Sequence, residues 1–245
     1  MSSKIKSSTA FKINWPCEKV VPSKKCEARV IQTLHRTGEW GRGRDLPPHR
    51  LDEIQDACNN NSMSLYQALS LRRTLLRSFP NGMQKVSRSS QMGTNSGQRE
   101  IATIFEDAVV EFVSSSLAAQ TNKKIFKTEA ELVKEMKNGT RERGPTPDIL
   151  FLHPVSINGR LVKWIDAKMY YASASFAHNK KLPNGKLSSM AQRYISHFGG
   201  QGAFVFGQSF CADLQDIVSH ALLLDATPLD MTAVCEFQNA SMKLE

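Results

Sequence analysis

Two short stretches of the sequence place acidic residues and a lysine at the ends of apolar runs. Pro147-Asp148 comes before one apolar run, and Asp166-Ala167-Lys168 closes the next. Charged groups are rarely buried without a partner or a task. Two carboxylates and an ammonium at neighbouring strand ends are therefore candidates for metal-assisted chemistry. The other interpretation is a solvated hairpin with two surface carboxylates, and the residue types alone do not decide between them.

The chemistry that these residues would support is phosphodiester hydrolysis. Mg²⁺ prefers hard oxygen ligands and keeps several waters, so one or two carboxylates are enough to hold it. Asp148 and Asp166 would bind the ion, with the carbonyl of Ala167 as a further ligand. Lys168 would orient or help to deprotonate the attacking water and offset negative charge in the transition state. Glu106 would add a ligand from a neighbouring helix.

The residue types of the triplet are weak evidence by themselves, so the interpretation depends on the predicted element in which the triplet lies. Glu135-Met136-Lys137 also fits the triplet, but it falls in a predicted helix and precedes Pro147-Asp148. Asp166-Ala167-Lys168 ends a predicted strand that follows the strand after Asp148. Since side chains alternate along a strand, Asp166 and Lys168 share one face.

The register of this hairpin decides whether the two aspartates meet. Asn158-Gly159 between two apolar runs predicts a two-residue turn. Regular pairing from that turn would set Asp166 opposite Phe151 and direct Asp148 to the other face of the sheet. A three-residue loop or a β-bulge would restore a common face, and bulges recur beside active sites. The sequence therefore predicts an irregular register here.

The elements that position these residues are predicted from periodicity and from turn residues. An amphipathic helix begins near residue 99 and carries Glu106 at one edge of its apolar stripe. From that residue the main order is α, β, β, β, α, β, with a small helix after the first strand. We expect an α/β (α+β) fold with a mixed sheet. The later predicted elements are a strand at 123–127, helices at 129–139 and 186–198, a strand at 202–207 and a helix at 213–224.

The first part of the chain is predicted to be helical and basic. Residues 1–22 are expected to be a flexible lead-in, residues 23–80 a helical domain, residues 81–98 a linker, and residues 99–245 the domain with the acidic motifs. The three predicted helices span 26–38, 47–59 and 62–79. The third carries Arg72, Arg73 and Arg77, which would grip phosphates in a helix-turn-helix-like module or would only favour the C-terminal end of a helix.

Charge is distributed unevenly along the chain. Residues 1–99 hold 17 Lys and Arg against 7 Asp and Glu, whereas the remaining 146 residues hold 15 against 16. This asymmetry indicates a polyanionic partner contacted mainly by the first part, with a solvated basic surface as the alternative.

Composition narrows the class of protein. No stretch of 18 apolar residues is present, so no membrane contact is expected, and the first residues lack a secretory signal. The five cysteines form no C-x-x-C pair, which favours reduced thiols over disulfides or a zinc site. We expect the nucleus and the cytoplasm as its location.

The motifs together carry a resemblance to a known superfamily. The α-β-β-β-α-β order with Pro147-Asp148 and Asp166-Ala167-Lys168 resembles the PD-(D/E)XK nuclease fold of restriction-endonuclease-like enzymes. More narrowly, Thr146-Pro147-Asp148 and Trp164-Ile165-Asp166-Ala167-Lys168 resemble the TPD-motif family, which includes the codanin-interacting nuclease of animals. The similarity extends from about residue 97 to the strand after Phe198-Gly199, and is fainter at 64–78.

The resemblance implies roles for individual residues. It makes Asp148 and Asp166 metal ligands and Lys168 the catalytic lysine, and it places the acidic residue of the first core helix at Glu106 or Glu100. The triplet has Asp where relatives carry Glu, so one carboxylate side chain is shorter. Tyr194 matches the family's spacing to Phe198-Gly199. Gln192 is an auxiliary candidate or an exposed helix glutamine, because family members place Gln and Tyr a full turn apart.

These observations predict a Mg²⁺-dependent (or Mn²⁺-dependent) nuclease that acts on DNA or RNA. The alternative is a non-catalytic nuclease fold that binds nucleic acid or acts as a scaffold through a protein partner, which by resemblance would be codanin-like. A third hypothesis is a DNA-binding regulator that uses the helix at 62–79. Metal binding separates the first hypothesis from the second, and metal-independent duplex binding would indicate the third.

Overall fold

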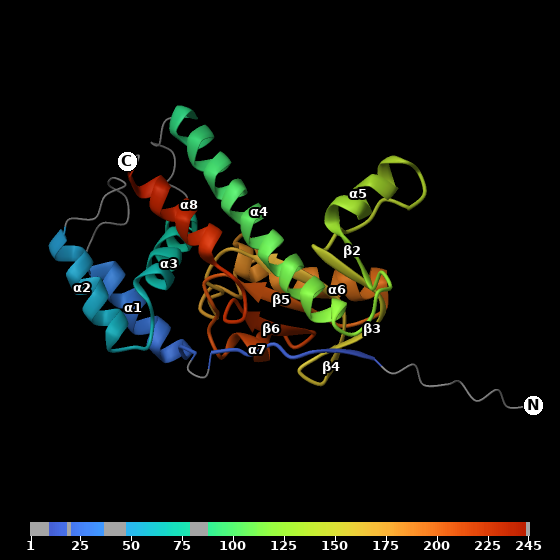
Figure 1. Ribbon diagram of the computed structural model, residues 1–245. Coiled ribbons are helices and arrows are strands. Elements are labelled where there is room, and N and C mark those ends of the chain that lie inside the picture. The colour runs from blue at the N-terminus through green and yellow to red at the C-terminus, as the bar shows by residue number, and fades with distance from the viewer. Residues whose placement is uncertain (1–9, 19–20, 37–47, 79–87, 244–245) are drawn as a thin grey trace, which may run out of the picture.

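The computed structural model describes residues 10–18, 21–36, 48–78 and 88–243 (Figure 1). Within this part of the chain the strands form one six-stranded mixed sheet in the order β1-β3-β4-β5-β6, with β2 paired to the same edge of β3 as β1. The strands are β1 (Phe11–Ile13), β2 (Phe126–Thr128), β3 (Ile149–Ile157), β4 (Arg160–Lys168), β5 (Gly202–Phe206) and β6 (Ala221–Asp225). β3 and β4 are antiparallel, and β4, β5 and β6 are parallel.

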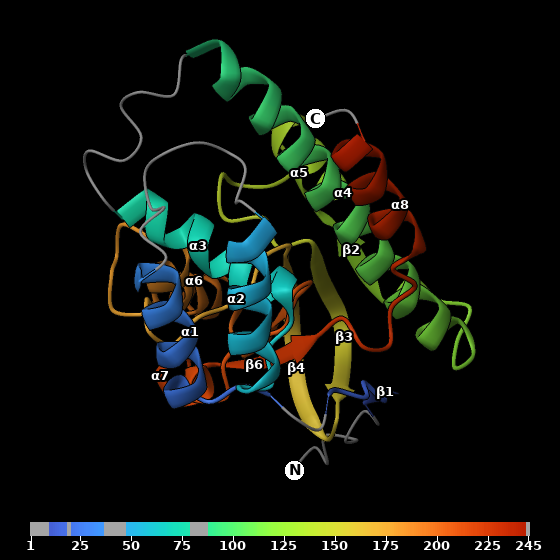
Figure 2. The ribbon, with the colours of Figure 1, turned by 90° about the vertical axis from the view of Figure 1, so that its left-hand side faces the viewer.

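Helices cover both faces of the sheet (Figures 1 and 2). The long helix α4 (Arg88–Ala118) packs on one face, with α8 (Thr232–Lys243) beside it. Their apolar side chains join one core cluster, which includes Phe105, Val109, Ile149 and Ile165. The other face carries α6 (Pro183–Phe198), α7 (Leu214–Ile217) and the three N-terminal helices. These are α1 (Lys24–Arg36), α2 (Pro48–Asn59) and α3 (Leu65–Ser78).

The N-terminal helices share their core with the sheet. One cluster of buried side chains joins Val30, Ile54 and Leu71 from α1, α2 and α3 to Trp164 and Phe204 of β4 and β5. Polar contacts cross the same boundary, since the Glu27 carboxylate accepts a hydrogen bond from the Ser175 N–H at 2.9 Å. The described part of residues 23–80 therefore forms three helices, as predicted, and these helices are packed into the same body as the acidic motifs.

The N-terminal lead-in differs from the expectation of a flexible segment over residues 1–22. Phe11–Ile13 forms β1, parallel to the end of β3, and residues 1–9 and 19–20 lie outside the described part. Trp15 is 1% exposed, and its indole N–H donates to the carbonyl of Asp225 at 2.9 Å. Burial of this apolar ring holds the segment against the sheet. The basic composition of residues 1–22 does not indicate this contact.

Two further segments also differ from the predictions. Residues 88–98, expected to belong to a linker, form the first turns of α4. Ser, Gly and Asn lower the helix propensity of a segment without excluding a helix. Residues 213–224, expected to be one helix, divide into α7 and the buried strand β6. The composition of a short apolar run such as 221–224 is compatible with both a buried strand and a buried helix.

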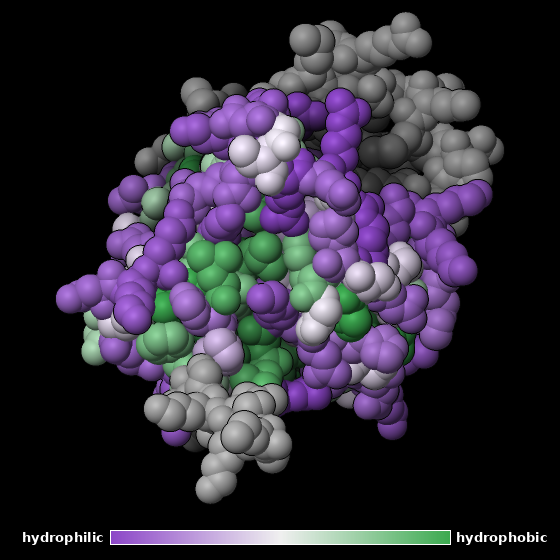
Figure 3. All heavy atoms as spheres, turned by 90° about the vertical axis from the view of Figure 1, so that its right-hand side faces the viewer, coloured by the Kyte–Doolittle hydropathy of each residue, from purple (hydrophilic) through white to green (hydrophobic). Residues whose placement is uncertain are grey.

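None of the described helices combines the length and the apolar content that a bilayer span needs. Figure 3 shows the side on which α5 (Glu129–Lys137) lies, with hydrophobic side chains near the centre of the view and hydrophilic ones around them. Tyr66, Leu152 and Leu161 are the large hydrophobic side chains that are clearly exposed among the described residues.

Candidate functional site

The pairing of β3 with β4 changes register in the middle of β3. Near the hairpin Val155 pairs with Val162, as a two-residue turn requires, but Leu150 pairs with Trp164 and Ile149 with Ile165. The shift between Leu150 and Val155 confirms the predicted irregularity. An odd shift exchanges the two faces of a strand. Continued by one pair, the new register sets Asp148 opposite Asp166.

The two aspartates lie together at this end of the hairpin. Asp148 is 7% exposed and Asp166 is 3% exposed. The Asp148 Oδ2 atom accepts a hydrogen bond from the backbone N–H of Ala167 at 2.5 Å. The Lys168 Nζ atom lies 2.7 Å from Asp166 Oδ2. The acidic motif and the triplet thus form one connected group on two adjacent strands.

A third and a fourth carboxylate complete the site from two helices. One carboxylate oxygen from each of Glu106, Glu129 and Asp148 lies within 4.8 Å of the others. Glu106 comes from α4, and Glu129 is the first residue of α5. The backbone N–H of Glu129 donates to the Asp148 carbonyl at 3.1 Å, and the Thr146 hydroxyl donates to Glu129 Oε1 at 2.8 Å.

Glu129 is the residue that sequence reasoning missed. The short helix was predicted to begin there, but no role was assigned to its first residue. The pairing of β2 with β3 places Glu129 in the site. It sets Thr128 opposite Ile149 and so brings Glu129 beside Asp148. Thr128 then caps α5 in a capping box with Glu131, which fixes the start of the helix.

Burial shifts the ionisation of the carboxylates in the site. Desolvation, followed by the charge of Asp166, raises the pKa of Asp148 to about 8. Desolvation also raises the pKa of Asp166, against the lowering effect of Lys168. For Glu106, desolvation and then the charge of Glu129 raise the pKa. Such shifts are expected where several carboxylates converge in a buried site.

Lys168 is the cationic group of the cluster. Burial by itself would lower its pKa, but the carboxylates of Asp166, Asp148 and Glu106 together raise it above the ordinary value. The lysine therefore carries a charge in this state of the protein. Its ion pair with Asp166 holds the ammonium beside the group of three carboxylates.

The donor set fits a hard divalent cation. Mg²⁺ binds oxygen ligands at about 2.1 Å, so two of its ligands lie at most about 4.2 Å apart. Oxygens of Glu106, Glu129 and Asp148 that lie within 4.8 Å of one another need only small side-chain movements to reach one ion. The same cation would relieve the electrostatic repulsion among these carboxylates. These three residues, with Asp166 adjacent, could hold Mg²⁺ or Mn²⁺.

The remaining predicted residues lie at different distances from this group. Tyr194 on α6 is 7% exposed and stacks near Trp164, with ring centroids 4.6 Å apart. Desolvation and then the charge of Asp166 raise its pKa, which places it close to the site. Gln192 is exposed, which agrees with its alternative interpretation as an exposed helix glutamine. Glu100 is also exposed. The structure therefore brings Glu106, and not Glu100, to the carboxylates.

The predicted phosphate-binding arginines lie on α3. Arg72 is half-buried and Arg73 is exposed, whereas the side chain of Arg77 lies outside the described residues. Neither described arginine is among the residues that form the acidic group. The backbone N–H of Ala167 contacts Asp148, and a ligand role for its carbonyl stays a prediction.

The sequence matches one protein family over residues 87–227, more than half of the chain. That family is described as a protein of unknown function with the TPD sequence motif. The matched range holds Thr146-Pro147-Asp148 and every acidic residue of the site. Comparisons with curated proteins and with solved structures found no match. The chain belongs to the TPD sequence-motif family.

Proposed function

We propose that the protein is a metal-dependent nuclease that hydrolyses phosphodiester bonds. The observation that carries this proposal is the convergence of Glu106, Glu129 and Asp148, each offering an oxygen within 4.8 Å of the others, beside the Asp166–Lys168 ion pair. The resemblance of the sequence motifs to the PD-(D/E)XK nuclease superfamily is a second support for the proposal.

The residues divide into metal-binding and charge-balancing groups. Asp148, Glu106 and Glu129 would hold Mg²⁺ or Mn²⁺, with Asp166 beside them. A bound Mg²⁺ would supply Lewis acidity toward a phosphate oxygen and a lowered pKa of coordinated water. Carboxylates alone would repel a phosphate, so the cation and Lys168 are both needed to make the site attractive to this substrate.

Lys168 has the position of a group that stabilises charge on the reacting phosphate. Its Nζ atom is held by Asp166 at 2.7 Å, and the side chain is 21% exposed. A buried carboxylate therefore orients the ammonium, and part of the lysine side chain stays exposed. There it would offset the negative charge that develops on a phosphate oxygen and orient the attacking water.

The test is cleavage of a panel of labelled DNA and RNA structures with Mg²⁺ or Mn²⁺. Wild-type protein should cleave at least one substrate, and Asp148→Ala and Lys168→Ala should lose cleavage by about three orders of magnitude or more. Nucleic-acid binding should stay within a few-fold in both variants. Glu100→Ala, on the exposed face of α4, is the matched control and should cleave as wild type does.

Metal titration separates the proposal from a non-catalytic scaffold. Isothermal titration of Mg²⁺ or Mn²⁺ should show binding to wild type and none to Asp148→Ala. Folded wild-type protein that neither binds the metal nor cleaves any substrate would refute the proposal and favour the scaffold. Equal loss of nucleic-acid binding and cleavage in folded variants would argue against the assigned roles.

A further inference from the structure

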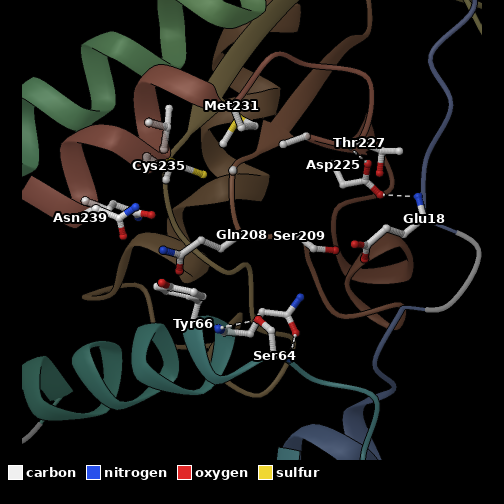
Figure 4. A pocket seen from close by; sticks show the side chains of 16 residues that line it. Glu18, Ser64, Tyr66, Gln208, Ser209, Asp225, Thr227, Met231, Cys235 and Asn239 are labelled. Atoms are coloured by element: carbon white, nitrogen blue, oxygen red, sulfur yellow. Dashed lines mark hydrogen bonds between the residues drawn. The ribbon is translucent and has the colours of Figure 1, made fainter. Parts of the chain in front are cut away.

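A pocket lies at the carboxyl ends of β5 and β6 (Figure 4). Its volume is about 430 Å³, within the range of small-molecule sites. The lining comes from the segment before α1, the start of α3, the turns after β5 and β6, and α8. In open α/β sheets, the crevice outside the carboxyl ends of parallel strands is where ligands bind.

The pocket and the acidic site both lie at the carboxyl end of β4. Met169 lines the pocket and directly follows Lys168. The turn after β5 is tied to the same place, because the Gly207 N–H donates to the Lys168 carbonyl at 2.9 Å. A Cβ atom on Gly207 would meet Met169 Sδ at 2.4 Å and the Phe105 ring at 3.3 Å, and Phe105 precedes Glu106. A ligand in the pocket would thus lie at the end of β4 that carries Lys168.

Two polar side chains in the pocket have unpaired atoms. Ser209 is 6% exposed, and its buried Oγ atom has no hydrogen-bond partner among the residues that the structure describes. The Ser209 hydroxyl faces the Glu18 carboxyl; burial raises the pKa of that carboxyl, and the hydroxyl lowers it. The buried Oε1 atom of Gln208 has no partner in the described residues either. Unpaired buried polar atoms in a pocket indicate a ligand that completes them.

The charge of the pocket selects the kind of ligand. Glu18 and Asp225 lie on one side of it (Figure 4). The Asp225 carboxylate is held in place, since it accepts the Glu18 N–H at 2.7 Å and the Thr227 N–H at 2.9 Å. The Glu18 carboxylate also lines the pocket, with Ser209 beside it. Two acidic groups disfavour a phosphate here and favour hydrogen-bond donors.

The opposite wall is suited to a flat ring. Tyr66, at the start of α3, is 49% exposed and lines the pocket, and Met231 and Met169 contribute soft apolar surface. Gln208 lies between Tyr66 and Ser209 in Figure 4. Aromatic side chains of this kind serve as stacking platforms for the bases of single strands.

We propose that this pocket binds one unpaired nucleobase of the strand that is cleaved at the acidic site. The proposal rests on the proposed function for the identity of the strand. Glu18 accepts hydrogen bonds from an exocyclic amino group, the Gln208 amide and the Ser209 hydroxyl complete the edge of the base, and Tyr66 stacks on its face. The phosphates stay outside, toward the metal-binding carboxylates.

The pocket should discriminate between bases. Adenine, cytosine and guanine carry an amino group that donates hydrogen bonds, whereas uracil and thymine present a carbonyl oxygen at the corresponding position. A carbonyl oxygen facing the Glu18 carboxylate would leave two acceptors in contact. Replacing Glu18 by glutamine supplies an N–H donor in the same place and should remove the discrimination.

The test uses the full chain without divalent metal, in EDTA, and nucleosides as the probes. Saturation-transfer NMR and titration calorimetry would measure the binding of adenosine, cytidine and uridine. We expect adenosine and cytidine to bind about fivefold to tenfold more tightly than uridine, as one mismatched hydrogen bond predicts. Glu18→Gln should bring uridine to within about twofold of cytidine.

Matched variants assign the binding to the pocket. Gln208→Ala and Tyr66→Ala should weaken adenosine binding by about fivefold or more. Tyr66 is 49% exposed, so its variant guards against a folding defect at Gln208. Gln201→Ala, an exposed glutamine before β5 that does not line the pocket, is the control and should bind as wild type does.

Failure of this inference is distinct from failure of the nuclease proposal. Absence of nucleoside binding, or equal binding by wild type and both pocket variants, would overturn the pocket assignment even if the protein cleaves nucleic acid. Pocket-dependent nucleoside binding without any cleavage would support the pocket and count against the nuclease.

Discussion

Asp148 holds its carboxyl group where protonation is favoured. Burial and the neighbouring Asp166 raise its pKa to about 8, above the value of about 3.8 for an unperturbed aspartate. The folded protein therefore binds the proton more tightly than the unfolded chain does. This contribution to stability is complete below about pH 4 and is lost as the pH rises toward 8.

Asp148→Asn should stabilise the metal-free protein at pH 8, since the amide keeps an acceptor for the Ala167 N–H and carries no charge. We expect a gain in the free energy of unfolding on the order of 1–3 kcal/mol, and a much smaller gain at pH 5. Urea denaturation in EDTA at the two pH values would measure it. Asp52→Asn, at an exposed position of α2, is the control. A loss of stability at pH 8 in Asp148→Asn would contradict this explanation.

Glu129 tests the part of the site that the tertiary structure added. Glu129→Gln should weaken Mg²⁺ binding by about 10-fold to 100-fold, because one carboxylate of the converging group is replaced by a weaker neutral ligand. Titration calorimetry would measure the change. Glu142→Gln, exposed in the loop after α5, should leave the affinity within about twofold. Equal affinities for Glu129→Gln and wild type would remove Glu129 from the site.

At the scale of elements, β4 is the strand on which the site is built, and its position depends on close packing with β5. Trp164 is fully buried between β5 and α6, and its indole N–H donates to the Gly200 carbonyl at 3.2 Å. Because of this packing, the indole ring leaves no space for a side chain at the start of β5. A Cβ atom on Gly202 would lie 2.0 Å from the indole ring.

Gly202→Ala should therefore destabilise the protein by about 1–3 kcal/mol, because the indole cannot move without disturbing β4. Denaturant titration would measure the loss, and Mg²⁺ affinity should fall with it as Asp166 moves. Gly97→Ala, within α4 where an added Cβ meets only Phe237 at 4.0 Å, is the matched control. It should be neutral or stabilising by about 0.5–1 kcal/mol, and a wild-type stability for Gly202→Ala would show that the strand adapts.

At the scale of the whole molecule, the acidic motifs depend on the helices that precede them. The Glu27 carboxylate of α1 accepts hydrogen bonds from Ser175, and the Tyr171 N–H donates to the Ser70 hydroxyl of α3 at 3.1 Å. Tyr171 follows Lys168 by three residues. One face of the sheet would lose much of its cover if these helices were absent.

A fragment of residues 99–245 should not fold on its own, since removal of the first helices exposes one apolar face of the sheet. Circular dichroism and urea denaturation would check this, with the full chain expected to unfold in one cooperative transition. Co-expression of the two fragments should restore a folded complex. A fragment that unfolds cooperatively at the midpoint of the full chain would show that the two parts are separate domains.

Much of the fold was readable from the sequence because it is encoded locally. The turn at Asn158-Gly159, the apolar stripe around Phe105 and the helix stop at Gly199 each depend on neighbouring residues, and all three are present. The split of 213–224 into α7 and β6 was not readable. Which partner buries a short apolar run depends on the rest of the fold.

For the candidate site, the sequence by itself determined the two aspartates, the lysine and the helix carrying Glu106, because these rest on residue type and strand alternation. Only the tertiary structure decided that Asp148 and Asp166 share a face, that Glu106 rather than Glu100 reaches them, and that Glu129 joins them. Each of these depends on register or helix placement across distant segments. A shift of one residue changes the outcome there without changing any local preference.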